Sequence, residues 1–178
     1  MSTLEAQLKE AFTGIAASGV PPYARERELV SLFVFGYLLP TLYGSAPLHS
    51  SAQIGIEVAV PQRQDRPNPR KNPDVCKDLV LWPEPGMVCW DSRGMPTLFP
   101  MAIIEWKTVN RKDPRAVARA KRDRAHPDLE WLRWYVAAAP TAEGYAVTVD
   151  LSTRQAGWRV QRVTASAEEP AWFVAGTA

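Results

Sequence analysis

The clearest pattern in the chain is an apolar stretch that ends in alternating charges, from Met101 to Lys107. Four apolar residues are followed by Glu105-Trp106-Lys107. Successive side chains of a strand point to opposite faces, so Glu105 and Lys107 project to the same side, about 6 to 7 Å apart along the strand. Because an unpaired buried charge is costly, we expect this strand end to lie at a rim open to solvent, metal or substrate.

A second strand is predicted from Asp78 to Trp82, where an acid precedes an apolar run. Asp78 lies 27 residues before Glu105, which leaves room for a hairpin that brings the two carboxylates together. Asp74, after Pro73, is the rival for the same role. The residues that follow Asp74 begin a strand poorly, so Asp78 is the preferred acid.

Helices are predicted from apolar spacing and from capping residues. Trp131, Trp134 and Tyr135 lie beside leucines at helical spacing, so they are interpreted as core and not as a base-stacking surface. The second helix is expected to bury a stripe of Leu29, Leu32, Phe33 and Gly36. The expected helices run from Ser2 or Thr3 to Ala17, from Ala24 to Leu39, from Asp113 to Ala125, and onward from Pro127 or Asp128.

Alternating apolar positions predict further strands, and turn-forming residues predict a hairpin arm. The arm is expected to turn at 91–94, and the last residues, Glu168 to Ala178, are interpreted as a tail docked by Trp172 and Phe173. The expected strands are Ile54 to Val60, Tyr145 to Asp150 and Trp158 to Val163. We expect a single domain over 1–178, with an N-terminal helix in 1–20, a core over 24–151 and a tail over 165–178.

Composition limits the class of protein. The chain has 178 residues, of which 46% are hydrophobic and 22% charged, as expected of one soluble domain. Cys76 and Cys89 form no CxxC pair, and no signal-like start precedes them, so a reducing, cytoplasmic location is predicted. The longest apolar run, Leu29 to Pro40, falls short of the roughly 20 residues that span a bilayer, so no membrane segment is expected.

Positive charge is concentrated in two stretches, although the net charge is only +2. One is the predicted loop from Pro61 to Lys77, which leads into Asp78, and the other is the third helix. Both are interpreted as phosphate-facing, with an ordinary solvated surface as the alternative. The candidate nucleic-acid-binding residues are Arg63, Arg66, Arg70, Lys71, Lys77, Arg115, Arg119 and Arg122.

The pattern Asp78…Glu105-Trp106-Lys107, with each half in an apolar strand, resembles the PD-(D/E)xK nuclease superfamily over Ala24 to Leu151. The resemblance implies an α/β, restriction-endonuclease-like sandwich, in which helices flank a central mixed sheet. It implies that Asp78 and Glu105 bind Mg²⁺, with Mn²⁺ as a substitute, and that Lys107 positions the attacking water. It also places a helix glutamate beside the metal. Glu28 is the preferred match and Glu26 the substitute, whereas Glu57 is expected to face solvent.

The expected function is therefore a metal-dependent phosphodiester hydrolase acting on DNA, more as an endonuclease than as an exonuclease, and leaving a 5′-phosphate. A non-catalytic binding or assembly module that retains the fold is the main alternative, because fold and function separate readily. An RNA or nucleotide hydrolase is a third. The sequence leaves the oligomeric state open, a homodimer included, and His49 is interpreted as an idle loop residue.

Overall fold

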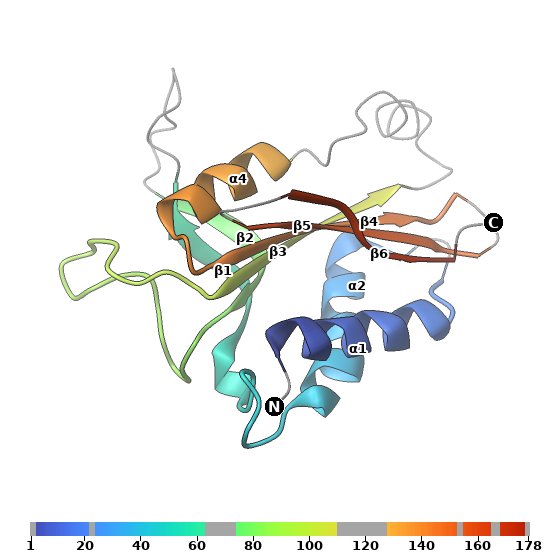
Figure 1. The fold of residues 1–178 in the computed structure, drawn as a ribbon, viewed down its shortest axis with the longest axis horizontal. Coiled ribbons are helices and arrows are strands. Elements are labelled where there is room, and N and C mark those ends of the chain that lie inside the picture. Colours follow the sequence, from blue (N-terminus) through green and yellow to red (C-terminus); the bar gives the residue numbers. More distant parts are fainter. Residues whose placement is uncertain are drawn as a thin grey trace.

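The computed structural model of the protein describes residues 3–21, 24–62, 74–109, 128–152, 155–164 and 168–176. Within these residues, six strands form one mixed sheet in the order β1-β2-β3-β4-β5-β6. Strands β3 and β4 are parallel, and all other neighbours are antiparallel (Figure 1). The strands are β1 (Ile54–Pro61), β2 (Asp74–Leu81), β3 (Ala102–Val109), β4 (Glu143–Asp150), β5 (Gly157–Val163) and β6 (Glu168–Ala175).

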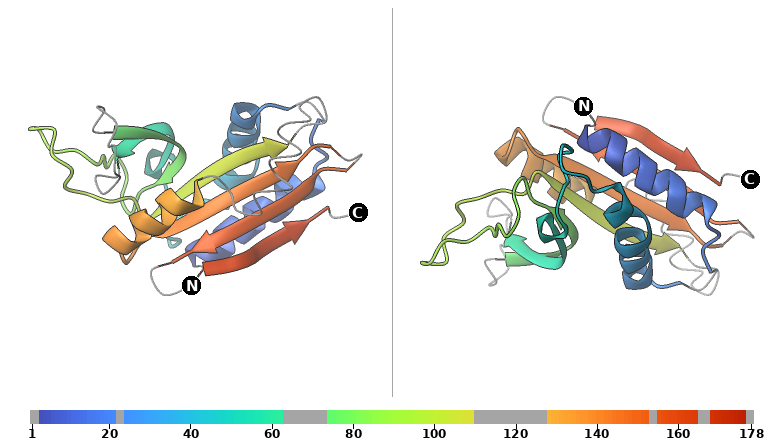
Figure 2. Two further views of the ribbon diagram at one scale, coloured as in Figure 1. Left: turned by 90° about the horizontal axis from the view of Figure 1, so that it is seen from above. Right: turned by 90° about the horizontal axis from the view of Figure 1, so that it is seen from below.

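Helices cover both faces of this sheet, which confirms the expected α/β class. Helices α1 (Leu4–Ala17) and α2 (Glu26–Phe33) lie on one face and α4 (Leu129–Ala138) on the other, as the two views of Figure 2 show. After α2 the chain continues through a π-helical turn, Val34–Leu38, and a 3₁₀ turn, Leu39–Thr41. A further 3₁₀ turn, Ser51–Gln53, leads into β1.

Aromatic rings fill the core between α1, α2 and the sheet. Phe12 of α1 lies 4.6 Å from Phe33 and 5.9 Å from Trp106 of β3, measured between ring centroids. Trp106 also packs edge-on against Trp158 of β5 at 6.0 Å. Leu8, Ala11, Phe12 and Ile15 of α1 are buried, and Thr3 caps the helix by accepting a hydrogen bond from the Ala6 N–H.

The core on the other face is built around α4. Leu129, Trp131, Leu132, Tyr135 and Val136 are buried there, which confirms that Trp131 and Tyr135 belong to the core. Gly144 of β4 allows the helix to approach closely, because a Cβ at that position would lie 3.1 Å from Leu132.

Two predictions about secondary structure and burial hold only in part. The segment expected to be a C-terminal tail is strand β6, in which Trp172 is buried against Phe12 and Tyr145. In the second helix Leu32 is 39% exposed, and Gly36 is exposed too. Leu29 and Phe33 are buried as expected, and with Val30 and Val34 they form a stripe whose centre lies about a third of a turn from Leu32.

The hairpin arm between β2 and β3 is only partly as predicted. The Asp91 carboxylate accepts the N–H groups of Arg93 and Met95 and so forms the expected turn. The flanking segments share one isolated bridge, between Trp90 and Pro96. The arm therefore projects from the sheet as a loop (Figure 1). In the part of the chain described here, no helix is both long and apolar enough to span a bilayer.

Candidate active site

The candidate site lies where β2 and β3 separate. Their ladder runs from Leu81 and Ala102 to Leu79 and Ile104. Directly beyond it, the Asp78 carboxylate accepts a hydrogen bond from the Trp106 N–H, with 2.8 Å between Oδ2 and N. Asp78 is thereby fixed against β3 beside Glu105.

The same geometry distinguishes Asp78 from Asp74, the alternative acid of this strand. Asp74 is the first residue of β2, and it pairs with Pro61 of β1 at the far end of that ladder. The Asp78 carboxylate acts electrostatically on both Glu105 and Glu26, which places it among the other acids. Asp78 is therefore the acid of β2 that lies beside Glu105, although the strand begins at Asp74 and not at Asp78 as expected.

The backbone around Asp78 is irregular. Lys77 packs on Trp131 of α4, whereas Leu79, two residues later, belongs to the core on the opposite face. In a regular strand both side chains would share one face. On the neighbouring strand, Glu57 lies between the two paired positions and has a φ of 54°, the left-handed region that a glutamate rarely adopts. The Glu57 side chain is exposed, as expected, and pairs with Arg27 at 2.6 Å.

Glu105 is buried against a lysine. It is 4% exposed, and its Oε1 lies 2.7 Å from the Nζ of Lys77. Burial raises the pKa of Glu105; the Lys77 ammonium opposes this rise, and the Asp78 and Asp128 carboxylates add to it. A group so far from its ordinary pKa, among like charges, is typical of a functional site.

Lys77 is not the exposed loop cation that the sequence predicted. Strand β2 begins at Asp74, so Lys77 lies inside it and is only 3% exposed. A buried ammonium cannot contribute to an exposed phosphate-binding surface. The other predicted basic residues lie outside the described residues: Arg63, Arg66, Arg70, Lys71, Arg115, Arg119 and Arg122.

Lys107 stands at the rim of the site, between the two helical layers. Its Nζ lies 3.2 Å from Oε1 of Glu26 in α2 and 3.6 Å from Oδ2 of Asp128, the residue before α4. Burial alone would lower the pKa of Lys107, but the nearby carboxylates outweigh burial and raise it. The side chain is 38% exposed, so this charged amine is accessible from solvent.

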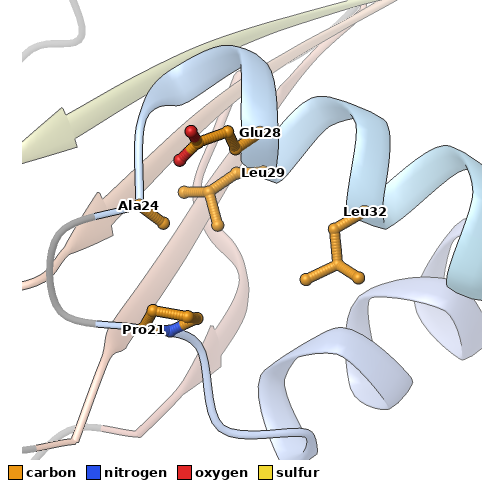
Figure 3. A pocket seen from close by; sticks show the side chains of 5 residues that line it. All are labelled: Pro21, Ala24, Glu28, Leu29 and Leu32. Carbon is orange, nitrogen blue, oxygen red and sulfur yellow. The ribbon is translucent and has the colours of Figure 1, made fainter.

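The helix acid at the site is Glu26 and not the preferred Glu28. The Glu28 carboxylate accepts the Arg25 N–H at 2.8 Å and so caps its own helix. It lines a pocket with Pro21, Ala24, Leu29 and Leu32 (Figure 3). Glu26 instead reaches Lys107, and burial raises its pKa, with Lys107 opposing and Asp78 adding to the rise.

Together these side chains carry an excess of negative charge. Four carboxylates (Glu26, Asp78, Glu105 and Asp128) face two ammonium groups (Lys77 and Lys107), which leaves a formal charge of −2 when all are ionised. Carboxylate oxygens are the donors that a divalent cation such as Mg²⁺ prefers. No group of three or more metal-ligating side chains is preformed in the described part of the chain. Asp78 and Glu105, which lie together beyond the β2–β3 ladder, could hold such an ion with water completing the shell, as Mg²⁺ prefers.

Sequence reasoning missed two members of this cluster. The sequence predicts a loop at Lys77, although Val75, a β-branched residue two positions before it, is a signal that this segment could be a strand. Asp128 was noted only as a helix start. Its position before an apolar helix carries no local sign of a contact with Lys107.

No protein-family model matches the chain, and neither a curated protein nor a solved structure matches it. Its function is therefore inferred from its own residues.

Proposed function

We propose that this chain is a metal-dependent phosphodiester hydrolase that acts on nucleic acid, with DNA as the preferred substrate class. The observation that carries the proposal is the bond between Asp78 and the Trp106 backbone, which holds one acid beside Glu105. Lys107 lies two residues further along β3, which pairs with β4 without a break, so the two side chains project to the same face. Two carboxylates and an amine at one strand end form a set suited to metal-assisted hydrolysis.

The order of the elements supports the finer description as a restriction-endonuclease-like sandwich. A helix with an acid, α2, precedes the antiparallel strands β1, β2 and β3. Helix α4 then crosses to the parallel strand β4, and helices lie on both faces. This is the order that the resemblance to the PD-(D/E)xK nucleases implies.

Each side chain then has a distinct task. Asp78 and Glu105 would hold Mg²⁺ or Mn²⁺, and the bound ion supplies a water of lowered pKa and charge neutralisation on the phosphate. Lys107, charged and accessible, orients that water or stabilises charge that develops on the phosphate. Glu26 and Asp128 hold the Lys107 amine from two sides, so that little reorganisation is needed during reaction.

Cleavage assays test the proposal directly. Purified protein is incubated with supercoiled plasmid, single-stranded DNA and RNA, each with Mg²⁺, with Mn²⁺ and with EDTA. We expect DNA cleavage that leaves 5′-phosphate ends with either metal and none in EDTA. Absence of cleavage of every substrate with both metals would contradict the proposal.

A non-catalytic nucleic-acid-binding or assembly module is the second candidate. It is favoured by one observation, namely that Lys77 already neutralises Glu105. A module of this kind would bind nucleic acid with the same affinity in Mg²⁺ and EDTA and would cleave nothing.

A further inference from the structure

The Lys77 ammonium takes no part in the tasks above, yet it is the most deeply buried charge in the site. It lies 2.7 Å from Glu105 Oε1 and 3.9 Å from the ring centroid of Trp131. Lysine is almost never fully buried unless it is paired, and burying an ion pair removes both charges from water at a cost that the pairing only partly offsets. A buried pair is therefore weak evidence for a purely stabilising role.

The ammonium is held by the protein and not by solvent. Trp131 stacks on Tyr135 with ring centroids 5.2 Å apart, so the ring under Lys77 is itself fixed in the α4 core. Lys107, the other lysine, is paired with Glu26 and Asp128. The two amines thus neutralise different acids, and only Lys77 is in contact with a carboxylate that would ligate the metal.

We propose that Lys77 is an internal counter-ion of Glu105 that neutralises this carboxylate in the metal-free protein and competes with the divalent cation for it. The inference rests on the proposed function, because it takes Glu105 as a metal ligand. The ammonium stabilises the metal-free fold and weakens metal binding, so that the cation is held reversibly.

Competition between Lys77 and the metal predicts that removal of the ammonium tightens metal binding, which a purely structural role of Lys77 does not predict. Without the ammonium, a buried carboxylate loses its counter-charge, so the metal-free protein becomes less stable. The cation, however, loses a positive neighbour and binds more tightly, by about tenfold or more at such short range.

The test uses Lys77→Met, which removes the charge and keeps much of the side-chain volume. Calorimetric titration at one pH and ionic strength gives the Kd for Mn²⁺, and urea unfolding in EDTA gives the stability of the metal-free protein. We expect a Kd at least about tenfold lower than wild type and a lower urea midpoint.

Lys9→Met is the matched control, because Lys9 pairs with Glu5 on the surface of α1 and its loss removes the same charge elsewhere. Its Kd should stay within about twofold of wild type.

Two further variants make the result specific. Adding Glu105→Gln to Lys77→Met should abolish the gain in affinity, since the gain acts through that carboxylate. Lys77→Gln, which keeps a hydrogen-bond donor, serves if Lys77→Met does not fold in EDTA, and it should also bind Mn²⁺ more tightly.

The outcomes separate this inference from the proposed function. If wild type binds Mn²⁺ and the Lys77 variants bind it no more tightly, competition is refuted while the proposed function stands. If neither wild type nor the variants bind Mn²⁺, both fail.

Discussion

Asp78 and Trp106 are joined across two strands by a hydrogen bond between a side chain and the backbone, with Asp78 Oδ2 2.8 Å from the Trp106 nitrogen. The bond lies directly beyond the last backbone pair of the β2–β3 ladder. It satisfies a strand N–H where the strands diverge, and it fixes a carboxylate beside Glu105. Asp78 therefore contributes to the fold and to the candidate site at once.

Substitutions of Asp78 should separate these two contributions. Asp78→Asn keeps an oxygen that can accept the Trp106 N–H, so the free energy of unfolding should change little, whereas Mn²⁺ affinity should be largely lost with the charge. Asp78→Ala also removes the acceptor and should cost roughly 1 to 3 kcal/mol of stability. Urea unfolding and Mn²⁺ titration measure the two effects. Equal loss of stability in both variants would show that the bond does not act as described.

Glu26 and Glu28 offer a matched pair on one helix. Glu26→Gln should lower the cleavage rate by about tenfold or more, because the Lys107 amine loses a charged partner. Glu28→Gln should leave cleavage unchanged, whereas Glu28→Ala should lower stability by about 0.5 to 2 kcal/mol through loss of the cap. Single-turnover cleavage and thermal unfolding provide the measurements. A larger loss of rate from Glu28→Gln would restore Glu28 as the helix acid.

Gln53 provides a prediction about stability alone. Its buried amide donates to the carbonyl oxygens of Pro47, Trp82 and Pro83 and accepts two backbone N–H groups. Gln53→Leu leaves these buried groups without their partner and should destabilise the protein by about 2 to 4 kcal/mol. Urea unfolding measures this loss. The Mn²⁺ affinity of the folded variant should match wild type, and a changed affinity would show that the Ser51–Gln53 turn influences the site.

Nucleic-acid binding should depend steeply on salt. The stretches that hold Arg63, Arg66, Arg70 and Lys71, and Arg115, Arg119 and Arg122, supply the charge for this prediction. Fluorescence anisotropy in Ca²⁺, which suppresses turnover, should show log affinity falling linearly with log salt concentration. Replacing the first four residues by glutamine should reduce that slope. Binding that is insensitive to salt would argue against a phosphate-facing surface.

The sequence predicts much of the site because strand alternation is local. The spacing of Glu105 and Lys107 places both on one face of β3, and β3 pairs with β4 without a break over both residues. Asp78 is recognisable because an apolar run follows it. These features depend only on neighbours along the chain.

Other features depend on partners distant in the sequence. The burial of Lys77 cannot be predicted from its own segment, because its neighbours Glu105 and Trp131 belong to two other elements. Both Glu26 and Glu28 lie within a turn of Leu29, and only the packing of α2 on the sheet places Glu26 against Lys107. Strand β6 begins with polar residues and is held by pairing with β5, which its own composition does not reveal.

The central claim, that Lys107 acts in catalysis at a metal site, is tested most directly by comparing Lys107→Ala with wild type in single-turnover DNA cleavage and in DNA binding. An interaction realised mainly in the transition state affects rate and not affinity, so the variant should cleave slower by orders of magnitude and bind DNA nearly as tightly. Lys107→Arg should not rescue, because a planar guanidinium cannot replace a compact ammonium at a fixed distance. Equal cleavage by wild type and Lys107→Ala, in protein free of contaminating nuclease, would contradict the account.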